Sequence, residues 1–94
     1  MLIEELFAKF DGAYAAHTLR AYRADFSHYR DWCHANELAP LELPAEDFVR
    51  FIDHMALTLS SATIRRRAAS VGTVMTMSNH RDVTKSTDVV LALK

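Results

Sequence analysis

Apolar residues recur at intervals of three and four positions along most of the 94-residue chain, which is the spacing of one face of an α-helix. We find no stretch of alternating apolar and polar residues of the kind that predicts a β-strand. The pattern therefore predicts an all-α protein with five helices. Their expected ranges are about 2–10, 16–36, a third helix that begins near Pro44, 61–78 and 86–93, with a loop over 79–85.

The apolar faces of these helices are expected to form a single core. The second helix has the richest face, because aromatic side chains follow one another at helical spacing: Tyr22, Phe26, Tyr29 and Trp32. We interpret these rings as core side chains rather than as a stacking surface for bases, and we expect Trp32 to be largely buried. The other expected apolar positions are Ile3, Leu6, Phe7 and Phe10; Leu19 and Cys33; Phe48, Phe51, Ile52 and Met55; Ile64, Ala68, Val71 and Met75; and Val89, Val90 and Leu93.

One short phrase occurs twice, at residues 15–20 and 60–65, and reads small, small, any residue, Thr, aliphatic, Arg. Each copy comes directly before a stretch of helical periodicity, so each predicts a helix start. The first turn of a helix has unpaired backbone N–H groups and a partial positive charge, which attract phosphate. A Thr hydroxyl and an Arg there add donors that suit a DNA backbone. The alternative is that Ser and Thr serve here only as ordinary helix starters.

Length and composition indicate one domain, 1–94, and a cytoplasmic location. Cys33 is the only cysteine, so no internal disulfide can form and a reducing compartment fits best. No apolar run approaches the roughly 20 residues that span a bilayer, so no membrane contact is expected. The two glycines and five scattered histidines give no phosphate loop, metal-ligand spacing or Ser–His–Asp order. We therefore expect no cofactor, no metal and no small-molecule substrate.

The net charge of −1 conceals an uneven distribution. Residues 35–57 carry five acidic side chains and one arginine, whereas residues 58–81 carry four arginines and no acidic side chain. The basic side chains are concentrated on the segments that contain the repeated phrase. This is the electrostatic pattern expected of a nucleic-acid-binding domain. A solvated helix face without a ligand is the alternative.

Four arginines flank the apolar stripes of their helices rather than joining them: Arg20, Arg23, Arg65 and Arg66. We expect them to lie on one continuous surface of the folded domain. Arg67 should stand apart from this surface or at its border, because three adjacent helical residues cannot all face one ligand.

Several short motifs, taken in order and spacing, resemble the N-terminal core-binding domain of tyrosine recombinases, the phage integrases and their relatives. The resemblance covers about residues 12–93. It rests on Thr18-Leu19-Arg20-Ala21-Tyr22-Arg23 with Asp25, on Phe26, Tyr29 and Trp32-Cys33, on Leu43-Pro44-Ala45, on Phe48-Val49 and Phe51-Ile52, and on Ser60 with Thr63-Ile64.

The resemblance implies a SAM-like orthogonal bundle of four to five helices that forms half of a C-shaped clamp around double-stranded DNA. It implies that the second and fourth helices lie across the major groove. The residues it assigns to DNA contact are Thr18, Arg20, Ala21, Arg23, Ala62, Thr63, Arg65 and Arg66. It also implies that the parent protein assembles with further recombinase subunits on DNA.

The chain departs from the family pattern at several places. Ala15 replaces a capping Ser, which should weaken the start of the second helix by about 1 kcal/mol. The loop 79–85 lacks the Gly and Pro common there, which leaves its shape open. The catalytic Arg, Lys, His and Tyr of the family belong to a domain that we expect to be absent from this chain, since Tyr14, Tyr22 and Tyr29 match none of them. The chain itself is therefore expected not to be an enzyme.

Two other functions fit parts of the sequence. SAM-like helical bundles also serve as protein–protein interaction domains, and a large exposed apolar patch would favour that function over DNA binding. A small helix-turn-helix regulator fits less well, because it needs short helices joined by a turn of about three to four residues.

Overall fold

The computed structural model describes the backbone of residues 3–94 and the side chains of residues 4–94. Two short 3₁₀ helices lie in the connections, and no strand occurs among the described residues, so the predicted all-α class is confirmed. The expected places of Leu2 in the first helix and of the Ile3 side chain in the core lie outside the described residues. The elements are α1 (Ile3–Lys9), α2 (Ala16–Ala35), η1 (Pro40–Glu42), α3 (Ala45–Ala56), α4 (Ser61–Met77), η2 (Val83–Lys85) and α5 (Thr87–Ala92).

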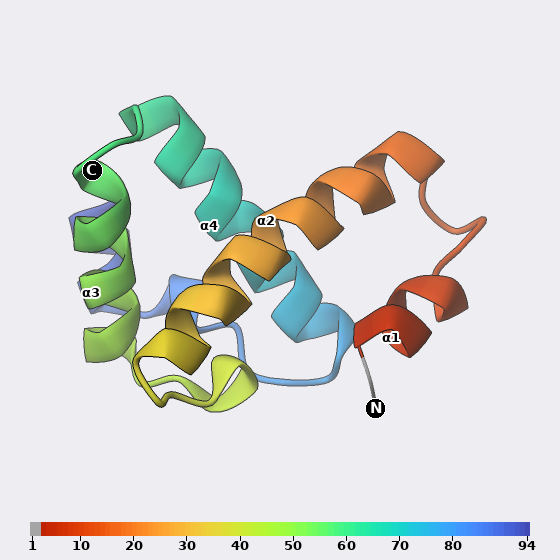
Figure 1. Ribbon diagram of the computed structural model, residues 1–94, viewed down its shortest axis with the longest axis horizontal. Coiled ribbons are helices and arrows are strands. Elements are labelled where there is room, and N and C mark those ends of the chain that lie inside the picture. Colours follow the sequence, from red (N-terminus) through yellow and green to blue (C-terminus); the bar gives the residue numbers. More distant parts are fainter. Residues whose placement is uncertain (1–2) are drawn as a thin grey trace.

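Helices α2 and α4 cross at the centre of the molecule (Figure 1). Helices α3 and α5 pack together on one side of this crossing, and α1 lies on the other side, near the first half of α2 (Figure 1). The helices meet at steep angles, so the bundle is orthogonal, as the resemblance implies. The first halves of α2 and α4 diverge from the crossing, and these are the halves that carry the repeated phrase.

Tyr29 occupies the centre of the core. Its ring packs against Phe26 and Phe51 at centroid distances of 5.6 and 5.2 Å, and its hydroxyl donates a hydrogen bond of 2.6 Å to the carbonyl of Pro40. The predicted faces of the helices supply most of the surrounding side chains. Val90, expected on the apolar face of α5, is an exception: it is exposed, because it lies about 100° around the helix from the buried Val89. The buried apolar residues are Leu6, Phe7, Leu19, Phe26, Tyr29, Cys33, Leu43, Phe48, Phe51, Ile52, Met55, Ile64, Ala68, Val71, Val74, Met75, Val83 and Val89.

Trp32 packs against the core but is not fully buried, so it lies at the margin of the core rather than inside it. Its ring packs on Phe51 at a centroid distance of 5.3 Å, and the Arg50 guanidinium lies 5.7 Å from the ring centre. Consecutive helical residues are rotated by about 100°, and Cys33 points directly into the core. This rotation leaves the Trp32 indole at the margin of the core.

Both copies of the repeated phrase begin helices, as predicted. The Ser60 hydroxyl oxygen accepts a hydrogen bond of 3.3 Å from the backbone N–H of Thr63 and so caps α4. Ala15 forms no such bond at the start of α2, which agrees with the weaker start expected there. Pro44 has an extended backbone, with ψ 151°, and occupies the N-cap position of α3. This helix therefore begins at Ala45, one residue later than predicted.

The loop after α4, whose shape the sequence left open, lies against that helix at Gly72. The Asp82 carboxylate accepts a hydrogen bond of 2.9 Å from the backbone N–H of Thr84 and caps η2. A Cβ on Gly72 would lie 2.7 Å from both carboxylate oxygens of Asp82 and 2.7 Å from the Thr84 hydroxyl oxygen. The missing side chain at Gly72 therefore allows the loop, and with it α5, to pack on the bundle.

Candidate nucleic-acid interface

The solvent face of α4 combines arginines with small side chains. Arg65 and Arg66 are exposed, as are Ala62 and Ala69, and helix α4 contains no acidic residue. Small side chains let a helix lie close to a partner, and the arginines supply charged donors for phosphate. Thr63, the last of the predicted α4 contacts, is partly buried beside the Ser60 cap.

The first half of α2 places its predicted contact residues at the surface as well. Arg20, Ala21 and Arg23 are exposed, and Thr18 is partly buried. The Arg23 guanidinium lies 3.2 Å from the Glu4 carboxylate of α1 and 5.2 Å from the ring centre of Phe7. Arg23 therefore faces α1, and its exposed ion pair leaves it free to exchange Glu4 for another anion at small cost.

The opposite side of α2 contacts α4 through Asp25, whose role the sequence did not reveal. Asp25 is 3% exposed. Its Oδ2 atom accepts a hydrogen bond of 2.7 Å from the Ser70 hydroxyl, and its Oδ1 accepts one of 3.0 Å from Nη2 of Arg66. Arg67 also points inward, with Nε 3.7 Å from Oδ1. The sequence contained a signal for this network. One helix has an acidic residue beside its core positions, and another has a run of arginines that could pair with it.

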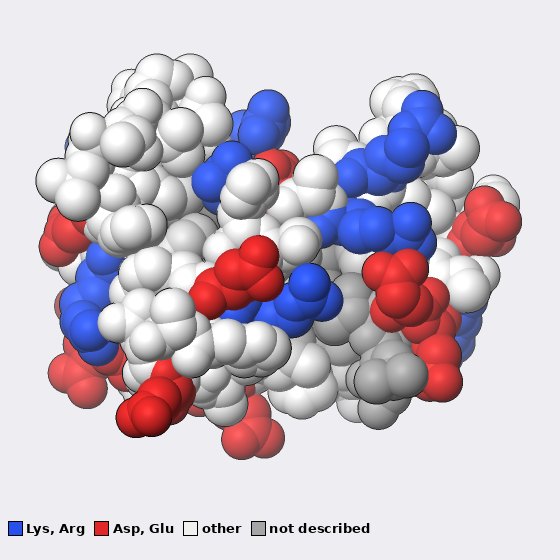
Figure 2. Space-filling model, in the orientation of Figure 1, with Lys and Arg blue, Asp and Glu red and all other residues white. Residues whose placement is uncertain are grey.

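The two arginine pairs lie on different helices, Arg20 and Arg23 on α2 and the other two on α4, and of the α4 pair only Arg66 reaches across to α2. Arg65 instead donates to the carbonyl of Leu93, at 3.5 Å. On the solvent-exposed surface of α2, Ala21 and Ala24 lie between the side that carries Arg20 and Arg23 and the side that contacts α4. Figure 2 shows Lys and Arg side chains on both sides of a hollow between the first halves of α2 and α4, with acidic side chains next to some of them and others along the lower edge of this view.

We predicted that the four arginines lie on one continuous surface, and this stays a prediction. The small exposed residues on the same helices favour it. Arg67, expected apart from this surface or at its border, has a side chain only 14% exposed. Arg20 and Arg23 belong to the first half of α2 and Arg65 and Arg66 to the first half of α4, the two helix halves that flank the hollow, and the same helices expose Ala21, Ala24, Ala62 and Ala69.

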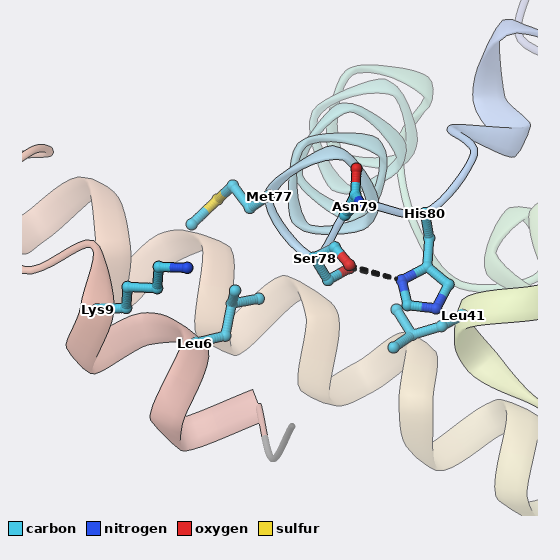
Figure 3. Close-up of a pocket in the computed structure, with 7 residues that line it drawn as sticks. All are labelled: Leu6, Lys9, Leu41, Met77, Ser78, Asn79 and His80. Atoms are coloured by element: carbon cyan, nitrogen blue, oxygen red, sulfur yellow. Dashed lines mark hydrogen bonds between the residues drawn. The ribbon is translucent and has the colours of Figure 1, made fainter.

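A pocket of about 360 Å³ lies at the other end of α4, between α1 and η1. Figure 3 shows Leu6 and Lys9 on one side of it and Leu41 and His80 on the other; Nδ1 of His80 lies 3.3 Å from the Ser78 hydroxyl and 2.9 Å from its carbonyl oxygen. Among the residues that the structure describes, no three His, Cys, Asp or Glu side chains are placed to hold a metal ion. In the same part of the chain, no helix has the length and apolar character needed to cross a bilayer.

Tyr29 and Cys33 are the groups whose acidity the fold changes most clearly. Burial raises the pKa of the Tyr29 phenol far above its ordinary value near 10, and Cys33 nearby raises it further. Burial likewise raises the pKa of the Cys33 thiol above its ordinary value near 9. Both groups stay protonated at neutral pH, so both act here as packing groups rather than as nucleophiles.

These shifts predict that the domain loses stability in alkali. The folded state holds both protons more strongly than the unfolded chain does, so their contribution is complete below about pH 8.5 and falls as pH rises past 9 and 10. Between the unfolded and the folded pKa of a group, the loss should approach about 1.4 kcal/mol per pH unit. Urea unfolding midpoints between pH 7 and pH 10.5 measure it. The Tyr29→Phe variant should be less stable at pH 7, since Pro40 loses its donor, yet should lose less between these pH values; an equal loss would contradict this explanation.

Comparisons with known proteins show the family to which the chain belongs. The family described as "Phage integrase, N-terminal SAM-like domain" matches residues 4–79. An integrase/recombinase xerD homolog from Selenomonas ruminantium is 32% identical over 57 residues. That alignment covers 61% of this chain and 17% of the relative, so the chain corresponds to a small part of that protein's length.

Proposed function

Because this chain belongs to the family of phage integrase N-terminal SAM-like domains, we propose that it is the DNA-binding, core-binding domain of a site-specific tyrosine recombinase. The observation that carries the proposal is the acid-free solvent face of α4, which meets α2 through the Arg66–Asp25 contact and borders the basic hollow. A duplex fits this surface because its charge lies on two regularly spaced backbones, which two diverging helices can contact together.

Each predicted contact residue has a role in this proposal. Arg20, Arg23, Arg65 and Arg66 bind phosphates, and they are exposed enough to do so without unfolding a helix. Ala21 and Ala62 let the helices approach the groove closely. Thr18 and Thr63 donate from the first helical turns, where the backbone N–H groups also face an anion.

In this proposal the catalytic activity of the whole recombinase belongs to another part of the protein. The domain binds the recombination site during DNA integration or recombination. A separate catalytic domain cuts and joins the strands. Such a protein would act in the cytoplasm, on the nucleoid, together with further recombinase subunits. Exposed apolar side chains on α5 and at the end of α3, namely Leu57, Val90 and Leu91, favour a protein contact of that kind and also support the protein-interaction function.

A titration with duplex DNA at different salt concentrations tests the proposed function. One module with about four phosphate contacts should bind with a Kd of roughly 10⁻⁴ to 10⁻⁶ M at physiological salt. The slope of log K against log salt should be about −3 to −4, because each phosphate contact contributes about −0.9. No cleavage product should appear. The absence of a complex at about 50 mM salt and high micromolar protein would reject DNA binding by this chain and favour the interaction domain.

A further inference from the structure

Three side chains of α4 face the buried carboxylate of Asp25, and they differ in their exposure to solvent. The Arg66 side chain is 62% exposed, whereas that of Arg67 is 14% exposed and Ser70 is buried. Arg66 thus combines a buried partner with a side chain that remains largely exposed to solvent. Arg67 carries a charge that only the protein interior can neutralise.

One donor in this cluster has no acceptor. The Nε–H of Arg67 is buried and finds no hydrogen-bond partner within the described part of the chain. It lies 3.7 Å from Oδ1 of Asp25, the same atom that accepts the 3.0 Å hydrogen bond from Arg66. A buried donor without an acceptor is unfavourable, and a shift of less than 1 Å would bring it within hydrogen-bond distance.

Resting on the DNA binding proposed above, we infer that Asp25 exchanges Arg66 for Arg67 when a DNA phosphate binds. Arg66 leaves Oδ1 for the phosphate, and Nε of Arg67 takes its place at Oδ1. Ser70 remains on Oδ2 in both states. The buried carboxylate therefore never loses its cationic partner, which would otherwise make the release of Arg66 costly.

Asp25 and Arg67 are positioning residues in this exchange. Asp25 holds Arg66 at the edge of the hollow before DNA arrives, which limits the conformational freedom that binding must remove. In this exchange Arg67 gains its hydrogen bond as Arg66 leaves, because the carboxylate is then free to shift the short distance toward Nε. DNA affinity therefore depends on a side chain that faces the interior and makes no contact with the duplex.

The Nε–H resonance of Arg67, observed by NMR in nitrogen-15-labelled protein, tests the exchange directly. Adding a short DNA duplex should shift this proton downfield and slow its exchange with water. The Arg66→Ala variant should show the shifted resonance before DNA is added, and DNA should change it no further. Arg65→Ala is the matched control, because Arg65 contacts Leu93 rather than Asp25 and its loss should leave the Arg67 resonance of the free protein unchanged.

A double-mutant cycle provides the second measurement. Arg67→Met should reduce DNA affinity about five- to tenfold more when Arg66 is present than in the Arg66→Ala background. Comparing the two backgrounds cancels the general effect of removing one positive charge. If Arg67→Met does not fold, as judged by circular dichroism, the resonance measurements decide alone.

The outcomes separate this inference from the proposed function. If duplex DNA binds while the Arg67 resonance stays in place, or if Arg67→Met weakens binding equally in both backgrounds, the exchange is refuted and DNA binding stands. If no complex forms at about 50 mM salt, the proposed function fails and the exchange fails with it. A shifted resonance in free Arg66→Ala, reproduced by DNA in the unaltered protein, supports both.

Discussion

Replacing Arg65 and Arg66 together with alanine is expected to reduce the slope of log K against log salt by about two units, from about −3 or −4. Two phosphate contacts are lost, and at about 50 mM salt this corresponds to a fall in affinity on the order of 100-fold. The fold should persist, because neither side chain belongs to the core and Asp25 keeps its 2.7 Å hydrogen bond from Ser70 and its proximity to Arg67. Fluorescence anisotropy of a labelled duplex at several salt concentrations measures both quantities.

The matched control removes the same amount of charge from another part of the surface. Arg50 lies on α3, paired with Asp47 and stacked on Trp32, and Arg81 is exposed in the loop that follows α4. The Arg50→Ala, Arg81→Ala double variant should keep a slope close to that of the unaltered domain. Equal losses in the two double variants would show that binding follows net charge alone, and would remove α4 as the contact surface.

Gly72→Ala is expected to destabilise the domain by about 1–3 kcal/mol, although alanine favours a helix over glycine by about 1 kcal/mol. The new methyl would lie 2.7 Å from both carboxylate oxygens of Asp82 and from the Thr84 hydroxyl oxygen. Asp82 cannot simply turn away, because its carboxylate caps η2 through the 2.9 Å hydrogen bond from the Thr84 backbone. Urea or thermal unfolding followed by circular dichroism gives the change in free energy.

The Asp82→Ala background provides the control for this explanation. It removes the obstructing carboxylate and frees the Thr84 hydroxyl to rotate, at the cost of the η2 cap. In that background Gly72→Ala should be neutral or stabilising, since only the helix preference of alanine remains. The same loss in both backgrounds would mean that something other than the packing of the loop on α4 makes position 72 intolerant of a side chain.

The sequence by itself determined the helices and most of the core. Apolar spacing is a local property, and it fixes which side of a helix is buried wherever that helix packs. The buried stripe of Phe26, Tyr29 and Cys33 and the two helix starts were accordingly predictable. The motifs of α2, of residues 43–52 and of the start of α4, in their order, were also enough to indicate the family. The exposed positions of Arg20, Arg23, Arg65 and Arg66 follow from helical periodicity.

Only the tertiary structure decided which helix each of these side chains meets. Asp25 and Arg66 are 41 positions apart, and Gly72 meets Asp82 across a turn that no periodicity describes. A local pattern gives the angle of a side chain around its own helix axis, but the crossing of α2 and α4 sets the distance to its partner. That crossing buries a carboxylate between two arginines that are adjacent in the sequence, of which Arg66 remains largely exposed and Arg67 is mostly buried.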